Sequence, residues 1–296
     1  MKIENPSSVN QDIPVVTIVM PIYNGARYLE SAIHSVLRQQ YSDWELICID
    51  DASTDGSGAI MARHAAEDSR IRHLTNDRNL GLPATLNRGF SEARGELHSW
   101  TSDDNIMRPN MIAKLVAELE AKPEADLVYA GYSVIDAAEN ILRYVAPPPM
   151  EERWFCNPVG AAFLYRRHVT EALGGYDEQL FGAEDYDYWL RAAHQFQMVP
   201  VDSDLYLYRR HDRSLTDQRS ADIRRLVSKV LLRELDHVDD KTLRAKALIH
   251  RILSDWYYFD VRLLLKALAS DPWTVFKASP QLSKDLMRAI VHRIRS

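Results

Sequence analysis

Two adjacent carboxylates, Asp103 and Asp104, follow a short apolar-alternating run that begins at Leu97. A predicted helix opens at Pro109, shortly after them. A strand that ends in carboxylates presents the oxygen ligands that hard cations such as Mg²⁺ and Mn²⁺ prefer, and these cations bind diphosphates. A capped turn also explains the pair, since Asp and Asn form local hydrogen bonds in turns. The rest of the chain decides between a metal site and a simple turn.

Polar side chains also follow two earlier apolar runs. Residues 21–24 end the run 15–21, and residues 50–57 follow the run 44–49. Ligands of open α/β sheets bind outside the carboxyl ends of the strands, so we predict that these clusters meet residues 102–105 at one edge. Carboxylates gathered at one edge repel one another, which a purely structural protein has no need to tolerate. The pattern therefore predicts a binding site.

The elements that would position these residues alternate between strand and helix. Strands are predicted at 15–21, 44–49, 71–75 and from 97, with helices at 28–39, 57–68, 82–94 and 109–121. Beyond these we predict strands at 127–135, 141–145, 159–165, 197–201 and 205–208, and helices at 167–173, 185–195, 217–237, 241–269 and 273–295. This order indicates βαβ units and an α/β fold with a mostly parallel sheet.

Composition places the chain among soluble globular proteins. Its 296 residues are 46% apolar and 26% charged. Two cysteines, Cys48 and Cys156, form neither a disulfide framework nor a zinc site, which fits a reducing, cytoplasmic compartment. The polar start of the chain predicts no signal peptide, and the lack of an 18-residue apolar run predicts no transmembrane helix.

The motifs together resemble the inverting family 2 glycosyltransferases, which have the GT-A fold. The matching stretches occur in order at 16–24 (VTIVMPIYN), 50–57 (DDASTDGS), 79–81 (NLG), 101–105 (TSDDN), 174–177 (GGYD), 184–185 (ED) and 208–216 (YRRHDRSLT). The resemblance implies a GT-A catalytic domain over 1–216, with a nucleotide-sugar half at 14–107 and an acceptor half at 108–216. Residues 217–296 lie beyond it and are predicted to form a helical C-terminal region.

The resemblance also implies roles for individual residues on the donor side. It places Pro21, Tyr23, Asn24, Asn79 and Ser102 in the nucleotide pocket. Either Asp50 or Asp51 would accept a hydrogen bond from the base, which is usually uracil, so the expected donor is a UDP-sugar.

A second group of roles concerns the metal and the transfer step. Asp104 would bind Mn²⁺ or Mg²⁺ directly, Asp103 would contact the ribose, the sugar or the metal, and His211 would join the metal site. Arg209 would clamp the diphosphate. The Glu184-Asp185 pair would supply the catalytic base, with Asp185 taking a proton from the acceptor hydroxyl.

Two departures from the family pattern refine this expectation. Many relatives have Asp-x-Asp or Asp-Asp-Asp at the metal site, whereas here Ser102 precedes the pair, which leaves the tightness of metal binding open. The Gln-x-x-Arg-Trp motif of processive synthases is missing, since Arg153-Trp154 lies before Asp185. We therefore expect one hexosyl or N-acetylhexosaminyl group to be transferred per binding event, to a saccharide or a lipid-linked acceptor, as in polysaccharide or cell-envelope biosynthesis.

The C-terminal region has a charge pattern of its own. Residues 241–296 hold 11 Lys+Arg against 4 Asp+Glu, whereas the remainder holds 25 against 38. Apolar residues such as Trp273 and Phe276 alternate with basic residues such as Lys277 and Lys284. Three interpretations are open: packing on the catalytic domain, peripheral contact with the inner face of the cell membrane, and contact with a second copy in a homodimer.

Other functions fit the sequence less well than glycosyl transfer. A nucleotidyltransferase also has acidic metal ligands at a sheet edge, but it needs a Gly- and basic-rich loop after the first strand, where this chain has only Gly25 and Arg27. A catalytically silent sugar-nucleotide-binding scaffold does not need both Asp104 and Asp185. Nucleic-acid binding is disfavoured because the body is acidic and lacks a known nucleic-acid module.

Overall fold

The computed structural model describes residues 15–212, 214–254 and 259–295. The polar start of the chain, from which we predicted the lack of a signal peptide, lies outside these ranges. The first half contains β1 (Val16–Ile22), α1 (Ala26–Leu37), β2 (Trp44–Asp50), α2 (Ser57–Glu67), β3 (Ile71–Thr75), α3 (Leu82–Ser91), β4 (Leu97–Trp100), β5 (Ile106–Met107) and α4 (Met111–Ala121).

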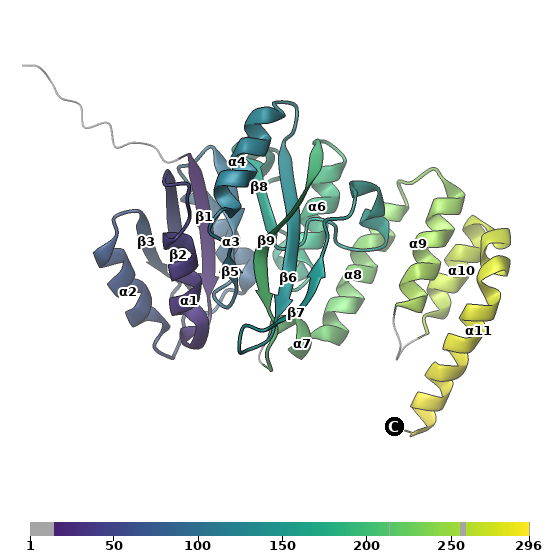
Figure 1. The fold of residues 1–296 in the computed structure, drawn as a ribbon. Coiled ribbons are helices and arrows are strands. Elements are labelled where there is room, and N and C mark those ends of the chain that lie inside the picture. The colour runs from purple at the N-terminus through teal and green to yellow at the C-terminus, as the bar shows by residue number, and fades with distance from the viewer. Residues whose placement is uncertain (1–14, 213, 255–258, 296) are drawn as a thin grey trace, which may run out of the picture.

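The second half starts with β6 (Leu127–Ile135), β7 (Ile141–Val145), the 3₁₀ turn η1 (Met150–Trp154), β8 (Ala162–Arg166), α5 (Arg167–Leu173), η2 (Glu178–Leu180), α6 (Glu184–Ala193) and β9 (Met198–Arg209). It ends with α7 (Leu215–Gln218), α8 (Ser220–Leu235), α9 (Lys241–Leu253), α10 (Val261–Ser270) and α11 (Pro272–Arg295). Figure 1 shows α9, α10 and α11 grouped beside α8 at one end of the molecule.

The strands form one mixed sheet in the order β3-β2-β1-β4-β8-β6-β9-β5, with β7 paired to β6. The pairs β3–β2, β2–β1, β1–β4 and β6–β9 are parallel. The antiparallel pairings are β4–β8, β5–β9, β6–β7 and β6–β8. Polar side chains after β1, β2 and β4 therefore meet at one sheet edge, as predicted.

Alternate residues of the central strands face two different cores, which explains why these strands read as continuous apolar runs. Ile18 and Met20 of β1 pack with α1, α2 and α4 on one face, while Val19 packs with α3, α5 and α6 on the other. Helices thus cover both faces of the sheet. No helix in the described ranges is long and apolar enough to cross a membrane.

The predicted helix 241–269 was wrong as a single element. The structure has α9 ending at Leu253 and α10 starting at Val261, where the Asp260 side chain accepts a hydrogen bond from the Arg262 amide at 2.8 Å. The break lets α10 fold back on α9, so that Leu263 joins the same buried cluster as Leu248. A single straight helix would keep these apolar side chains apart. The predicted strands 197–201 and 205–208 are likewise one bulged strand, β9.

Candidate functional site

A cavity of about 600 Å³ lies at the sheet edge where β1, β2 and β4 end. The predicted site residues that line it are Pro21, Tyr23, Asn24, Asp51, Asn79, Ser102, Asp103, Asp104 and His211. Four others, Asp50, Glu184, Asp185 and Arg209, are not among the lining residues. The structure thus brings together nine predicted residues from five separate segments of the chain.

Asp50 and Asp51 are neighbours in sequence but have different surroundings. The Asp51 carboxylate lines the cavity and accepts hydrogen bonds from the Leu80 amide at 2.8 Å and the Gly81 amide at 2.9 Å. Asp50 turns away and accepts from the Ser53 amide at 2.8 Å. Only Asp51 is therefore placed to meet a ligand in the cavity, and it also fixes the loop that carries Asn79.

Asn24 joins the loops that follow β1 and β2. Its side-chain oxygen accepts a hydrogen bond from the Thr54 amide at 2.8 Å, and its own amide donates to the Ser53 hydroxyl at 2.9 Å. Its φ of 54° is left-handed, a conformation that Asn tolerates better than most residues. Asn24 thus joins the two loops at the cavity wall through both its side chain and its backbone.

Asp103 lies against the backbone that follows β1. A Cβ atom on Gly25 would overlap its carboxylate, so only glycine allows this close approach. Burial raises the pKa of Asp103 to about 8, and the negative charge of Asp104 adds to the rise. A cation in the cavity would favour the charged form of this carboxylate.

Asp104 and His211 form a pair of candidate metal ligands across the cavity. Nε2 of His211 lies 3.1 Å from Oδ2 of Asp104, although the two residues are far apart in sequence. The ring of Tyr28 packs against His211, with centroids 4.9 Å apart. Burial raises the pKa of Asp104, and the hydrogen bond from His211 offsets part of this rise. Carboxylate oxygen and imidazole nitrogen are both suitable ligands for Mn²⁺.

Arg209 lies beneath this pair and does not reach into the cavity. Its side chain is 1% exposed, and its Nε donates to the Asp104 carbonyl at 2.7 Å. Its Nη2 contacts Glu139 at 2.9 Å, and its guanidinium stacks over Tyr28. Among the described residues, Arg27 is the arginine or lysine that lines the cavity; it is 57% exposed and lies 3.8 Å from Asp212. Arg27 is the second residue of α1 but precedes the helix predicted at 28–39, and no motif of the resemblance includes it.

Glu184 and Asp185 begin α6. Burial raises the pKa of Glu184 to about 8, with the charge of Asp185 adding to it, and the Glu184 carboxylate accepts from the Gly182 amide. Burial also raises the pKa of Asp185, against the hydrogen bond that Asn157 donates to its Oδ2 at 2.9 Å. Asn157 was missed in the sequence because no regular motif surrounds it.

Tyr208 lies in β9, next to Arg209. Burial raises the pKa of the Tyr208 phenol, and the negative charges of Asp104 and Asp185 add to the rise. Its hydroxyl lies 3.1 Å from that of Thr216. Asp185 does not line the cavity, although Phe181, four residues before it in the chain, does.

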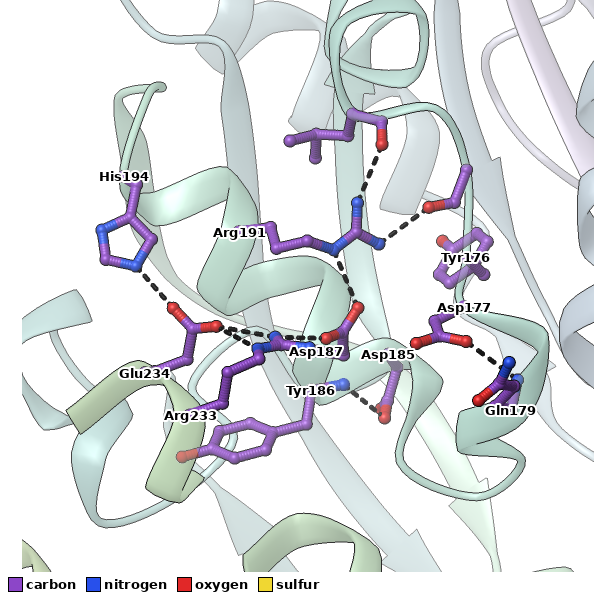
Figure 2. Close-up of polar contacts among 12 residues, drawn as sticks. Tyr176, Asp177, Gln179, Asp185, Tyr186, Asp187, Arg191, His194, Arg233 and Glu234 are labelled. Carbon is purple, nitrogen blue, oxygen red and sulfur yellow. Dashed lines mark hydrogen bonds and ion pairs between the residues drawn. The ribbon is translucent and has the colours of Figure 1, made fainter. Parts of the chain in front are cut away.

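Charged side chains hold α6 in place (Figure 2). Asp187 is fully buried and binds Arg191 at 2.8 Å and Arg233 of α8 at 2.5 Å. Arg191 also donates to the carbonyls of Leu173 and Gly175 at 2.9 and 2.7 Å. These bonds connect the first turn of α6 with the GGYD loop on one side and with α8 on the other.

Comparison with known proteins gives a consistent result. Residues 17–173 match the family model described as glycosyl transferase family 2. An uncharacterized glycosyltransferase of Rickettsia conorii is 32% identical over 64% of this chain and 32% of its own length. The uncharacterized glycosyltransferase EpsJ of Bacillus subtilis is 31% identical over 69% of this chain and 64% of its own length. The chain therefore spans less than two thirds of either relative.

Solved structures are similar in fold. Residues 1–349 of S. aureus TarS, in complex with UDP-GlcNAc, align with a TM-score of 0.68 at 14% identity, covering 94% of this chain and 88% of that fragment. The mannosyltransferase PcManGT of Pyrobaculum calidifontis, in complex with GDP-Man and Mn²⁺, aligns with a TM-score of 0.58 at 20% identity, covering 94% and 75%. The family model and the structural similarity together show that this chain belongs to glycosyl transferase family 2 and has the GT-A fold.

Proposed function

We propose that this protein transfers one sugar from a nucleoside-diphosphate sugar, with UDP as the nucleotide, to a hydroxyl of a saccharide or lipid-linked saccharide. The observation that carries the proposal is the cavity in which Asp51, Asp103, Asp104 and His211 converge. Neighbours of the same fold that bind UDP-GlcNAc or GDP-Man with Mn²⁺ support it. The sugar itself, a hexosyl or N-acetylhexosaminyl group, is part of the proposal.

The residues on the donor side of the cavity have separate roles in this proposal. In our proposal Asp51 accepts a hydrogen bond from the base, since it lines the cavity and Asp50 does not. Arg27 faces the diphosphate, because among the described residues it is the arginine or lysine that lines the cavity. Arg209 supports the site from below by holding the Asp104 backbone.

Asp104 and His211 would hold a divalent cation, Mn²⁺ or Mg²⁺, with Asp103 beside them. Their 3.1 Å separation and their place on the cavity wall fit this role. Such a cation, when bound, supplies positive charge against the departing diphosphate. The positive charge at this site would also favour the charged form of Asp103 at neutral pH, although burial raises the pKa of this residue to about 8.

Asp185 would act as general base in a single displacement. The acceptor oxygen forms a bond to the anomeric carbon as the bond between that carbon and the diphosphate breaks. The proton of the acceptor hydroxyl passes to the Asp185 carboxylate. Attack from the side opposite the leaving group inverts the anomeric centre. A base of this kind contributes about 10²–10⁴-fold to the rate.

The proposal is tested first by nucleotide binding. Thermal unfolding is measured in the presence of UDP, dTDP, GDP or CDP, each with and without Mn²⁺. A ligand at about 100 times its Kd adds roughly 2.7 kcal/mol to the free energy of unfolding. We expect a shift with UDP that requires Mn²⁺ and is lost in Asp104→Ala, but is retained in Asp239→Ala, which removes an exposed carboxylate between α8 and α9. No shift with any nucleotide would contradict the proposed nucleotide pocket.

The transfer step is tested with Asp185→Asn. This variant should bind UDP and Mn²⁺ as the unmodified protein does, because Asp185 does not line the cavity. Its turnover of the UDP-sugar should fall at least about 10²-fold, since the base is removed. Unchanged turnover would exclude Asp185 as the base.

A further inference from the structure

Three metal-ligating side chains converge on the helices α1 and α2, outside the cavity. Oε1 of Glu30 lies 3.2 Å from Nε2 of His64 and 3.6 Å from Nε2 of His34. The ligand atoms of all three residues lie within 4.8 Å of one another. No motif of the glycosyltransferase resemblance includes these residues, and the proposed transfer step does not use them.

Helix geometry explains the convergence. Glu30 and His34 are four residues apart on α1 and therefore share one face. His64 comes from α2, which packs against α1, and its side chain is only 3% exposed. The buried imidazole has little freedom to turn away, and the three groups are therefore held together before any ligand arrives.

We propose that Glu30, His34 and His64 form a binding site for a divalent transition metal of the Zn²⁺ class. A tetrahedral zinc site with metal–ligand distances of 2.0–2.1 Å places its ligand atoms about 3.3–3.4 Å apart. The two distances from the Glu30 oxygen bracket this spacing. Two imidazoles and one carboxylate are a common zinc ligand set, in which water takes the fourth position.

Neighbouring groups suit this role. Arg63 contacts the other oxygen of Glu30, Oε2, which fixes the carboxylate and leaves Oε1 directed at the histidines. The side chain of His34 is 47% exposed and provides a path for entry. Imidazole nitrogens favour Zn²⁺, Ni²⁺ or Co²⁺ over Mg²⁺, so this site differs in preference from the carboxylate-rich site at Asp104.

A metal here would join the two helices that start at the donor cavity. α1 follows Gly25, whose amide donates to the Ser57 hydroxyl at 3.1 Å, and Ser57 is the first residue of α2. The Ala26 amide also donates to Asp55 at 3.1 Å. Joining α1 to α2 would therefore stabilise the loops that shape the cavity.

Zinc binding to the full chain tests the proposal. An Asp104→Asn variant, which weakens the cavity site, is titrated with Zn²⁺ alone by calorimetry and by thermal unfolding. We expect one equivalent to bind and to raise the unfolding temperature. Adding His34→Gln or Glu30→Gln should raise the Zn²⁺ Kd at least 10-fold; both substituted residues are partly exposed, so the fold should be retained.

A matched control separates this site from chance binding to surface histidines. His168 lies 2.8 Å from Asp126 and is 49% exposed, but it belongs to no group of three ligating side chains found in the described residues. His168→Gln in the Asp104→Asn background should leave the Zn²⁺ Kd unchanged. Failure of the Asp104→Asn protein to bind Zn²⁺, or equal binding by the His34→Gln, Glu30→Gln and His168→Gln proteins, would overturn the proposal.

Discussion

Individual hydrogen bonds determine what each acidic side chain at the site can do. Asp50 and Asp51 have the same chemistry, yet only Asp51 faces the cavity. Asp185 is buried enough for its pKa to rise, and the amide of Asn157 acts in the opposite direction. The pKa of Asp185 matters most for transfer, because a general base must be deprotonated to act.

Asn157→Leu should shift the pH dependence of transfer. The Asn157 hydrogen bond favours the charged carboxylate, so its loss raises the pKa of Asp185 further above its ordinary value. Activity is present above that pKa and lost as pH falls through it. A hydrogen bond to a charged group is worth roughly 1.5–3 kcal/mol, so the acidic limb of kcat/KM should move up by about 1–2 pH units. The measurement is a pH–rate profile with a UDP-sugar.

The control for this prediction is another Asn–Asp hydrogen bond. Asn140 donates to Asp136 at 3.0 Å on the exposed β6–β7 turn. Asn140→Leu should leave the acidic limb in place. A slower Asn157→Leu enzyme with an unmoved limb would mean that Asn157 positions other groups and does not tune the base.

At the scale of elements, α6 depends on its neighbours for its place. Its first turn carries Asp185, and its buried Asp187 is bound by Arg191 and by Arg233 of α8. Tyr186 and Leu190 of α6 share a buried cluster with Val230 and Leu231 of α8. α8 lies beyond the predicted catalytic boundary at 216 but packs directly on the helix that carries the proposed base.

Arg233→Gln should therefore weaken both stability and transfer. In this variant Asp187 would still be paired with Arg191, and the lost Arg233 side chain is 44% exposed. We therefore expect the free energy of unfolding, measured by urea denaturation, to fall by about 1–2 kcal/mol. Transfer should fall while UDP binding is retained, because α6 does not line the donor cavity. Arg167→Gln, which removes an exposed pair with Glu171, should cost less than about 0.5 kcal/mol. Equal losses in the two variants would contradict the role assigned to α8.

At the scale of the molecule, the last helices carry an apolar surface of their own. Leu265, Leu268, Trp273 and Phe276 are exposed, and Lys277 lies over the Trp273 ring. Exposed aromatic and basic side chains on helices are typical of contact with an anionic lipid surface. Such contact would bring a lipid-linked acceptor near the enzyme, and it remains one of our predictions.

Liposome flotation at low salt tests this contact. The protein should float with anionic vesicles and remain below neutral ones. Trp273→Ser combined with Phe276→Ser should abolish flotation, whereas Ile141→Ser with Leu142→Ser, an exposed apolar pair on β7, should not. No flotation of the unmodified protein would exclude the membrane interpretation, and a dimer that the Trp273/Phe276 variant loses would favour a second copy instead.

The sequence predicted the elements that show a clear apolar pattern over several residues. β1 and β2 were recognised from continuous apolar runs, because both faces of these strands are covered. The break between α9 and α10 was missed, because apolar spacing continues across it and the signal at Asp260 is a single capping side chain. β5 was also missed, since two residues are too short to show a period.

The sequence by itself determined the family, the sheet edge and the types of residue gathered there, because motifs and strand ends are local properties of the chain. Tertiary structure decided which of these residues face the cavity. It turned Asp50 away, placed Arg209 beneath Asp104, brought Arg27 to the cavity wall and paired Asn157 with Asp185. These outcomes depend on packing between segments far apart in the chain, which no local pattern encodes.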